Sequence, residues 1–194
     1  MSKSVPAALK KGRNKTIRWV VIIFIVTMIV SGMITLVSDE IMSVSGLGVA
    51  FGVLLLIIFI GVIFDVIGMA VASADEKPFH SMAARKVPGS LEALMLLKNA
   101  ERVSSICNDV IGDICGVVAG SASATVAVQI LQKFEFSAPQ VISLLLSALV
   151  AGLTVGGKAI GKFFAIHSCT KIVHNVGKIF YWFRHIPDMF RKKT

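Results

Sequence analysis

The 194-residue sequence is poor in charged residues, which make up only 16% of the chain, against about 25% in an average soluble protein. Hydrophobic residues make up 55%, and the mean hydropathy is +0.81. So few polar side chains cannot cover the surface of a soluble domain, which excludes an ordinary cytosolic enzyme and a disordered chain. Three cysteines, Cys107, Cys115 and Cys169, are too few for a small disulfide scaffold. The composition is that of an integral membrane protein.

Four stretches are long and apolar enough to cross a bilayer, which takes about 20 residues. They are residues 19–37, 47–72, 103–128 and 139–163. We therefore expect an all-α integral membrane protein with four transmembrane helices. The remaining segments are a basic tail (1–18), a helical loop (73–102) and a basic amphipathic juxtamembrane helix with its tail (166–194). The first apolar stretch is longer than that of a signal peptide, so we expect an uncleaved anchor.

The basic residues are distributed very unevenly between the two sides of this predicted bundle. Six lie in the N-terminal tail, five in the 73–102 loop, and eight at the end of the fourth span and beyond it. The other two loops together hold one, Lys133, and the short 38–46 loop carries Asp39 and Glu40. By the positive-inside rule, both termini and the 73–102 loop are cytoplasmic, in the cell membrane. The net charge of +9 then reflects topology and contact with anionic lipids, so no nucleic-acid partner is expected.

Two segments have the pattern of helices at the membrane surface. Pro88-Gly89 divides the 73–102 loop into two short helices, the second capped by Ser90. After His167 the chain is amphipathic, with apolar residues on one face up to Pro187, where we expect the helix to end. That helix either lies in the plane of the membrane or packs on a soluble partner.

Charged residues also occur inside the predicted spans. Asp65 lies far along an inward-running span, Asp109 and Asp113 lie early in an outward-running one, and Lys158 ends the apolar run of the fourth. At about 1.5 Å per residue, all four fall in the inner half of the bilayer. Isolated charges there are costly, so they must pair, hydrate or neutralise. The small residues Gly112, Gly116 and Gly120, and the glycines of the fourth span, predict close contact between spans three and four.

Two interpretations of these charges stay open. In the first, Asp65, Ser105, Asn108, Asp109 and Asp113 form an oxygen-rich cation site, open to the cytoplasm, because hard cations such as Mg²⁺ prefer such ligands. In the second, Asp65 or Asp109 neutralises Lys158, and the other carboxylates reach water at the inner face.

Three segments, in order, resemble the CNNM/CorC family of magnesium transporters. The stretch FDVIGMAVASADEKPFHSMAARK (64–86) is similar to the family's F-S-G-S-E-T-A-L-x-S segment and the helical loop after it. LLKNAERVSSI (96–106) resembles L-x-x-x-P-E-R-F-L-S-T, and VGGKAIGKFFA (155–165) resembles V-F-G-E-I-I-P-K-T-L-A. The matching residues are Phe64, Ala70, Ser73, Glu101, Arg102, Ser105, Gly157, Ile160 and Lys162.

The chain departs from this pattern at polar positions that bind the transported ion in the family. Asp65 replaces a serine, Gly68 a glutamate, Lys158 another glutamate and Gly161 a proline. The resemblance also implies a homodimer. The 19–37 helix precedes the family's three-helix core, and no CBS pair follows in this sequence, so regulation through CBS domains is not expected.

The sequence thus leads to two hypotheses on function. The first is a divalent-cation (Mg²⁺-like) membrane transporter or a divergent relative, with Asp65, Ser105, Asn108, Asp109 and Asp113 at the site. Lys158 would be its counter-charge or gate, and Mg²⁺ would be cargo rather than a cofactor. The alternative is a non-transporting membrane partner or assembly protein with a structural Asp–Lys cluster. No arrangement of nucleophile and base suggests an enzyme.

Overall fold

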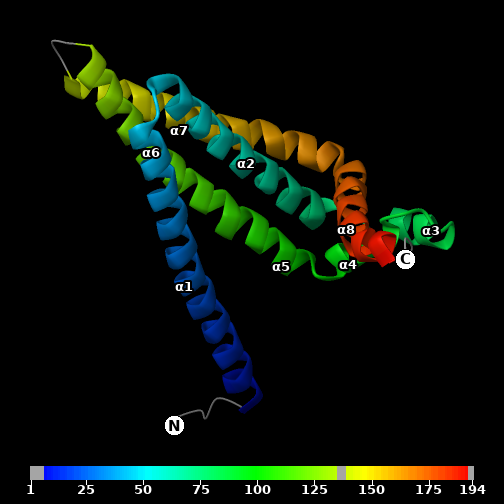
Figure 1. Cartoon of the computed structure of the whole chain (residues 1–194). Coiled ribbons are helices and arrows are strands. Elements are labelled where there is room, and N and C mark those ends of the chain that lie inside the picture. The colour runs from blue at the N-terminus through cyan, green and yellow to red at the C-terminus, as the bar shows by residue number, and fades with distance from the viewer. Residues whose placement is uncertain (1–6, 135–138, 192–194) are drawn as a thin grey trace, which may run out of the picture.

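The computed structural model describes residues 7–134 and 139–191, and within these ranges the chain is helical without strands (Figure 1). Four helical stretches are long and apolar enough to span a membrane: 17–42, 47–73, 100–133 and 139–167. The prediction of an all-α membrane protein with four spanning helices is therefore confirmed. The third stretch is the longest of the four at 34 residues, and it shares with the fourth the lowest mean hydropathy, 1.8.

The first two spans are α1 (Ala7–Val44) and α2 (Leu47–Ser73). Between them only Ser45 and Gly46 are outside a helix, so the expected 38–46 loop is wrong. Residues 38–44 contain neither proline nor glycine, and α1 continues through them. Asp39 accepts a hydrogen bond from Thr125 Oγ1 at 3.3 Å, which ties this end of α1 to the third span.

The third span is built from three consecutive helical pieces. These are α5 (Ala100–Ser105), the π-helical segment η1 (Ile106–Gly112) and α6 (Asp113–Lys133). The fourth span is α7 (Pro139–His167). Buried residues of α1, α2, α6 and α7 form one apolar core around Leu54, Val126 and Val150.

A second apolar core lies where the spans meet the short helices α3 (Lys77–Ala84), α4 (Ser90–Lys98) and α8 (Cys169–Arg191). Phe79, Leu94, Leu97 and Val173 are buried there with residues from the ends of α2 and α7. In Figure 1 these three helices gather at the end of the bundle opposite the one where α6 ends and α7 begins.

Some local predictions for these short helices were wrong. Ser90 is the first residue of α4 rather than its cap, and its hydroxyl donates to the Val87 carbonyl at 2.6 Å. The helix α4 buries Ala93, Leu94 and Leu97, whereas its large apolar residues Leu91 and Met95 are exposed. Pro187 does not end α8, which continues to Arg191.

The helix α1 stands apart from the others along much of its length. Figure 1 shows it close to α6 and α2 near its C-terminal end and diverging from α5 and α6 towards its N-terminus. At the divergent end, the Arg102 guanidinium lies 6.0 Å from the centre of the Trp19 ring, a cation–π contact. Most of the apolar surface of α1 is therefore free to contact lipid.

Candidate functional site

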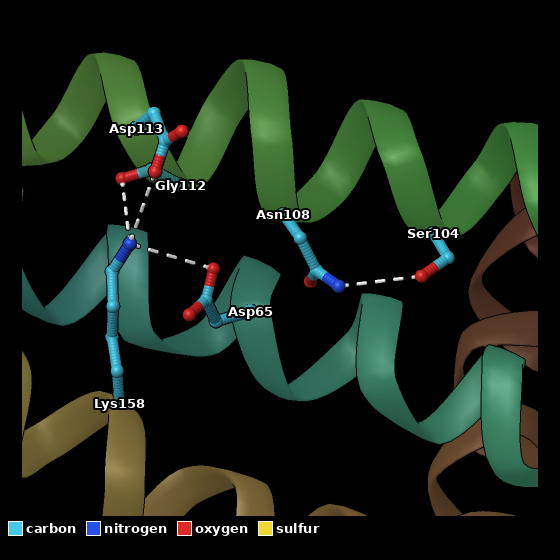
Figure 2. A network of polar contacts seen from close by, with 6 residues as sticks. All are labelled: Asp65, Ser104, Asn108, Gly112, Asp113 and Lys158. Carbon is cyan, nitrogen blue, oxygen red and sulfur yellow. Dashed lines mark hydrogen bonds and ion pairs between the residues drawn. The ribbon is translucent and has the colours of Figure 1, made fainter.

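The charged residues of three spans meet at the ammonium group of Lys158. Its Nζ lies 3.6 Å from Asp65 Oδ1 and 3.6 Å from Asp113 Oδ1. It also donates a hydrogen bond to the backbone carbonyl of Gly112 at 3.2 Å. Figure 2 shows Lys158 extending from α7 past α2 to reach α6. Three oxygens from the second and third spans thus surround one ammonium group, which the fourth span supplies.

The members of this cluster differ greatly in their contact with solvent or lipid. The side chain of Asp65 is 5% exposed and that of Lys158 is 20% exposed, whereas that of Asp113 is 70% exposed. The pair Asp65–Lys158 is therefore enclosed by protein, and Asp113 closes the cluster from an open side. A carboxylate as enclosed as Asp65 needs a cation or strong donors, and Lys158 supplies the cation.

Close approach of the helices makes this meeting possible, and α2 lies at its centre. A Cβ added to Gly112 would overlap the carboxylate of Asp65, and one added to Gly61 would lie 2.8 Å from Cys115 Cβ. On the other side of α2, a Cβ on Gly161 would lie 2.6 Å from Val66 Cγ2. Glycines therefore let α6 and α7 pack directly against α2.

The predicted close contact between spans three and four is confirmed, because α6 and α7 pack together in the first apolar core, but the glycines expected to make it do not. Gly116 and Gly120 of α6 have nothing within 4 Å of an added Cβ, and neither do Gly152 and Gly156 of α7. The glycines that are in close contact face α2 instead, because α2 lies between the charged parts of the other two spans.

The π-helical segment η1 sets which polar groups of the third span face α2. It takes one more residue per hydrogen-bonded turn than an α-helix, which rotates the side chains on either side of it relative to each other. Gly112, its last residue, provides the carbonyl that accepts from Lys158. Nothing in the sequence pattern signals this segment, so the contribution of the Gly112 carbonyl was missed.

Asn108 lies within η1 and faces α2, apart from the Lys158 cluster (Figure 2). Its Nδ2 donates to Ser104 Oγ at 3.3 Å, a contact that the sequence did not suggest. Its Oδ1 is buried and has no hydrogen-bond partner, and a Cβ on Gly68 would overlap it. An acceptor oxygen without a donor in this position is costly unless a ligand or water satisfies it.

Ser105 and Asp109 form a separate pair. The Ser105 hydroxyl donates to Asp109 Oδ2 at 2.8 Å, and the Asp109 side chain is exposed. No basic group lies within ion-pair distance of Asp109 in the described ranges. The five predicted ligands thus lie in three places: Asp65 and Asp113 at the Lys158 ammonium, Asn108 against α2, and Ser105 with Asp109.

This geometry determines both the metal-binding capacity and the net charge of the cluster. Among residues 7–134 and 139–191, no group of three or more histidine, cysteine or acidic side chains could hold a metal ion as they now stand. The cluster nevertheless has two carboxylates and one ammonium, so its formal charge is −1, and Asp109 adds a further negative charge beside it. Lys162, one turn further along α7, is a second cation, so these parts of the second to fourth spans hold three carboxylates and two ammonium groups, an excess of one negative charge.

No protein-family model matches the chain, and neither a curated protein nor a solved structure matches it. What the site does chemically therefore rests on its own residues and their geometry.

Proposed function

We propose that this chain is a divalent-cation (Mg²⁺-like) membrane transporter, or a divergent relative of one. The carboxylates of Asp65 and Asp113 form the cation site, and Lys158 is the counter-charge that an entering ion displaces. The observation that carries the proposal is the excess of negative charge among the polar side chains of the spans. Such charge in a bilayer requires water or a cation, and a purely structural cluster would be expected to be neutral and closed.

The ligand types favour a hard cation. Carboxylate, carbonyl and hydroxyl oxygens are the groups that bind Mg²⁺, which also keeps several of its waters. The position now held by the Lys158 ammonium has carboxylate oxygens on two sides and the Gly112 carbonyl on a third. The buried Oδ1 of Asn108 is a further acceptor without a donor on the same span. The half-buried Ser105, just before η1, and the exposed Asp109 within it would line the approach of the ion.

The distribution of charge along the sequence supports a site that opens to the cytoplasmic side of the membrane. With nineteen of the 20 lysines and arginines on one side, both termini and the 73–102 loop are placed in the cytoplasm and the site in the inner half of the cell membrane. The resemblance to CNNM/CorC transporters supports the same class of cargo and suggests a homodimer.

A second candidate is favoured by one specific observation. Lys158 lies within 4 Å of the enclosed Asp65, as expected if the cluster only holds three helices together. A hollow between α2 and α7 that is lined by Val62 and Gly157, among others, is apolar and includes none of the acids. In this alternative, the chain is a non-transporting membrane partner or assembly protein.

Mg²⁺ flux into proteoliposomes separates the two candidates. We expect Asp65→Asn and Asp113→Asn to lower the flux about tenfold or more, the equivalent of at least ~1.4 kcal/mol. The matched control is Asp75→Asn, which removes an exposed carboxylate outside the spans and leaves the flux unchanged.

The lysine gives the sharper comparison. Lys158→Met removes the competing ammonium and should lower the Mg²⁺ concentration at half-maximal flux. Lys162→Met, an exposed lysine one turn further along α7, should not. Wild-type flux no greater than that of empty liposomes, with Lys158→Met and Asp65→Asn affecting only the stability of the protein, would establish the structural alternative instead.

A further inference from the structure

A second feature of the molecule lies outside the spans, on α8. Near its start, Val173 and Gly177 are buried against the rest of the protein. Beyond Gly177 the helix exposes large apolar side chains: Ile179, Phe180, Trp182 and Phe183 are each more than half exposed. The first part of α8 therefore anchors the helix, and the second part presents an apolar and aromatic surface.

The anchor holds α8 tightly against the turn before α4. Gly89 has a φ of 83°, a left-handed conformation that favours glycine. A Cβ on Gly177 would overlap the Gly89 carbonyl oxygen and would lie 3.0 Å from the amide nitrogen of Ala93. The backbones thus touch without intervening side chains. The residues around Pro88 are held at a set distance from the exposed part of α8.

Two adjoining hollows lie along this contact. One, of 570 Å³, is mainly apolar and lies between Pro88 and the side chains of Ile179, Trp182 and Phe183. The other, of 440 Å³ and here called the polar hollow, has a more polar lining than the first and includes Lys86, Glu92, Arg184 and His185. Pro88 and Tyr181 line both, so the hollows are neighbours along the helix.

The charge in the polar hollow favours an anion. Lys86 and Arg184 are permanent cations, and Glu92 is the single carboxylate among the lining residues. The His185 ring stacks on Tyr181 with 4.0 Å between ring centres, and its Nδ1 is 2.9 Å from the Tyr181 carbonyl oxygen. When Nδ1 donates to that carbonyl, Nε2 is left for another partner.

We propose that the two hollows together bind one anionic phospholipid. Its phosphate would lie by Lys86 and Arg184, and the upper part of an acyl chain would lie against Trp182 and Phe183. An amphiphile fits because an apolar and a cationic hollow adjoin, whereas a free phosphate would use only one of them. Trp and Tyr prefer the headgroup level of a membrane, and basic pockets at the cytoplasmic face bind anionic headgroups. The proposal is independent of ion transport.

Quenching of Trp182 by lipids with brominated acyl chains tests the site. The chain has two tryptophans, so Trp19→Phe leaves Trp182 as the reporter. We expect brominated phosphatidylglycerol to quench it more than brominated phosphatidylcholine at the same mole fraction. In that background, Lys86→Gln with Arg184→Gln should lower the preference for phosphatidylglycerol over phosphatidylcholine about fivefold or more. This estimate follows from the usual contribution of a basic residue to binding at an anionic membrane surface.

The matched control is Lys98→Gln with Lys171→Gln. These exposed lysines lie on α4 and α8 outside both hollows, and their loss should leave the preference unchanged. The same two pairs of substitutions should also be made in the chain that keeps both tryptophans. Native mass spectrometry should then show less retained phosphatidylglycerol for the Lys86 and Arg184 variant than for the control, which guards against an effect of Trp19→Phe on folding.

Several results would overturn the proposal. Equal quenching by the two lipids would mean general membrane contact, and an equal effect of the control pair would mean diffuse electrostatics. Absence of quenching by either lipid would mean that something else, such as a second copy of the chain, covers the hollows. Loss of the preference on adding inorganic phosphate at constant ionic strength would assign the polar hollow to a soluble anion.

Discussion

The enclosed pair of Asp65 and Lys158 should be strongly coupled in the stability of the folded protein, whichever function the cluster serves. Their charged atoms are 3.6 Å apart, and both side chains are largely buried. At that distance two unit charges attract by about 4–5 kcal/mol if the effective dielectric constant is ~20. The distance exceeds that of a normal hydrogen bond, so we expect a coupling energy of about 2–4 kcal/mol.

A double-mutant cycle isolates this energy. Lys158→Met keeps the length of the side chain but leaves Asp65 enclosed without a cation, which should cost about 3–5 kcal/mol of unfolding free energy. Asp65→Asn should cost less, because Lys158 keeps the Asp113 carboxylate and the Gly112 carbonyl. The combined variant should recover most of the loss, since it removes both charges together.

The same cycle on Asp113 provides the control. Because the Asp113 side chain is 70% exposed, its coupling to Lys158 should be below about 1 kcal/mol. The measurement is reversible unfolding in mixed micelles, with increasing denaturing detergent and helical circular dichroism as the signal. A coupling below about 0.5 kcal/mol for Asp65–Lys158, or equal values for the two pairs, would refute the arrangement described for the cluster.

Three further predictions concern packing and pH. Gly177→Leu should separate α8 from the Gly89 turn, seen as faster proteolysis after residue 84, whereas Gly152→Leu, at a position with open space, should not. Gly68→Ala should displace the Asn108 amide and cost about 1–3 kcal/mol of unfolding free energy, again with Gly152 as the control site. Burial lowers the pKa of His174 below 6.5, so the unfolded chain binds more protons and stability should fall as pH drops through and below 6.5. Replacing His174 by Gln should flatten that dependence between pH 7.5 and 5, and replacing the exposed His167 should not.

The class of the protein was readable from the sequence because the bilayer imposes simple constraints. A span must be long and apolar and must satisfy its backbone internally, so hydropathy alone identified four helices. The aspartates and Lys158 could likewise be placed at one level by counting residues along each span. Element ends were less predictable, as the continuation of α1 through residues 38–44 and of α8 past Pro187 shows.

The pairing of the charged side chains could not be predicted by counting residues along each span. Counting gives the position of a residue along its helix but not the rotation of that helix, and the π-helical segment Ile106–Gly112, which contains Asp109 and ends before Asp113, changes the rotation without any sequence signal. Asp109 and Asp113, four residues apart, therefore have different partners: Asp113 meets Lys158, whereas Asp109 accepts a hydrogen bond from Ser105. The sequence by itself determined that four helices are long and apolar enough to span a membrane and that charged residues lie within them. Only the tertiary structure, through the close packing of α6 and α7 on α2, decided which charged side chains touch. The direction in which each side chain points depends on contacts between distant parts of the chain.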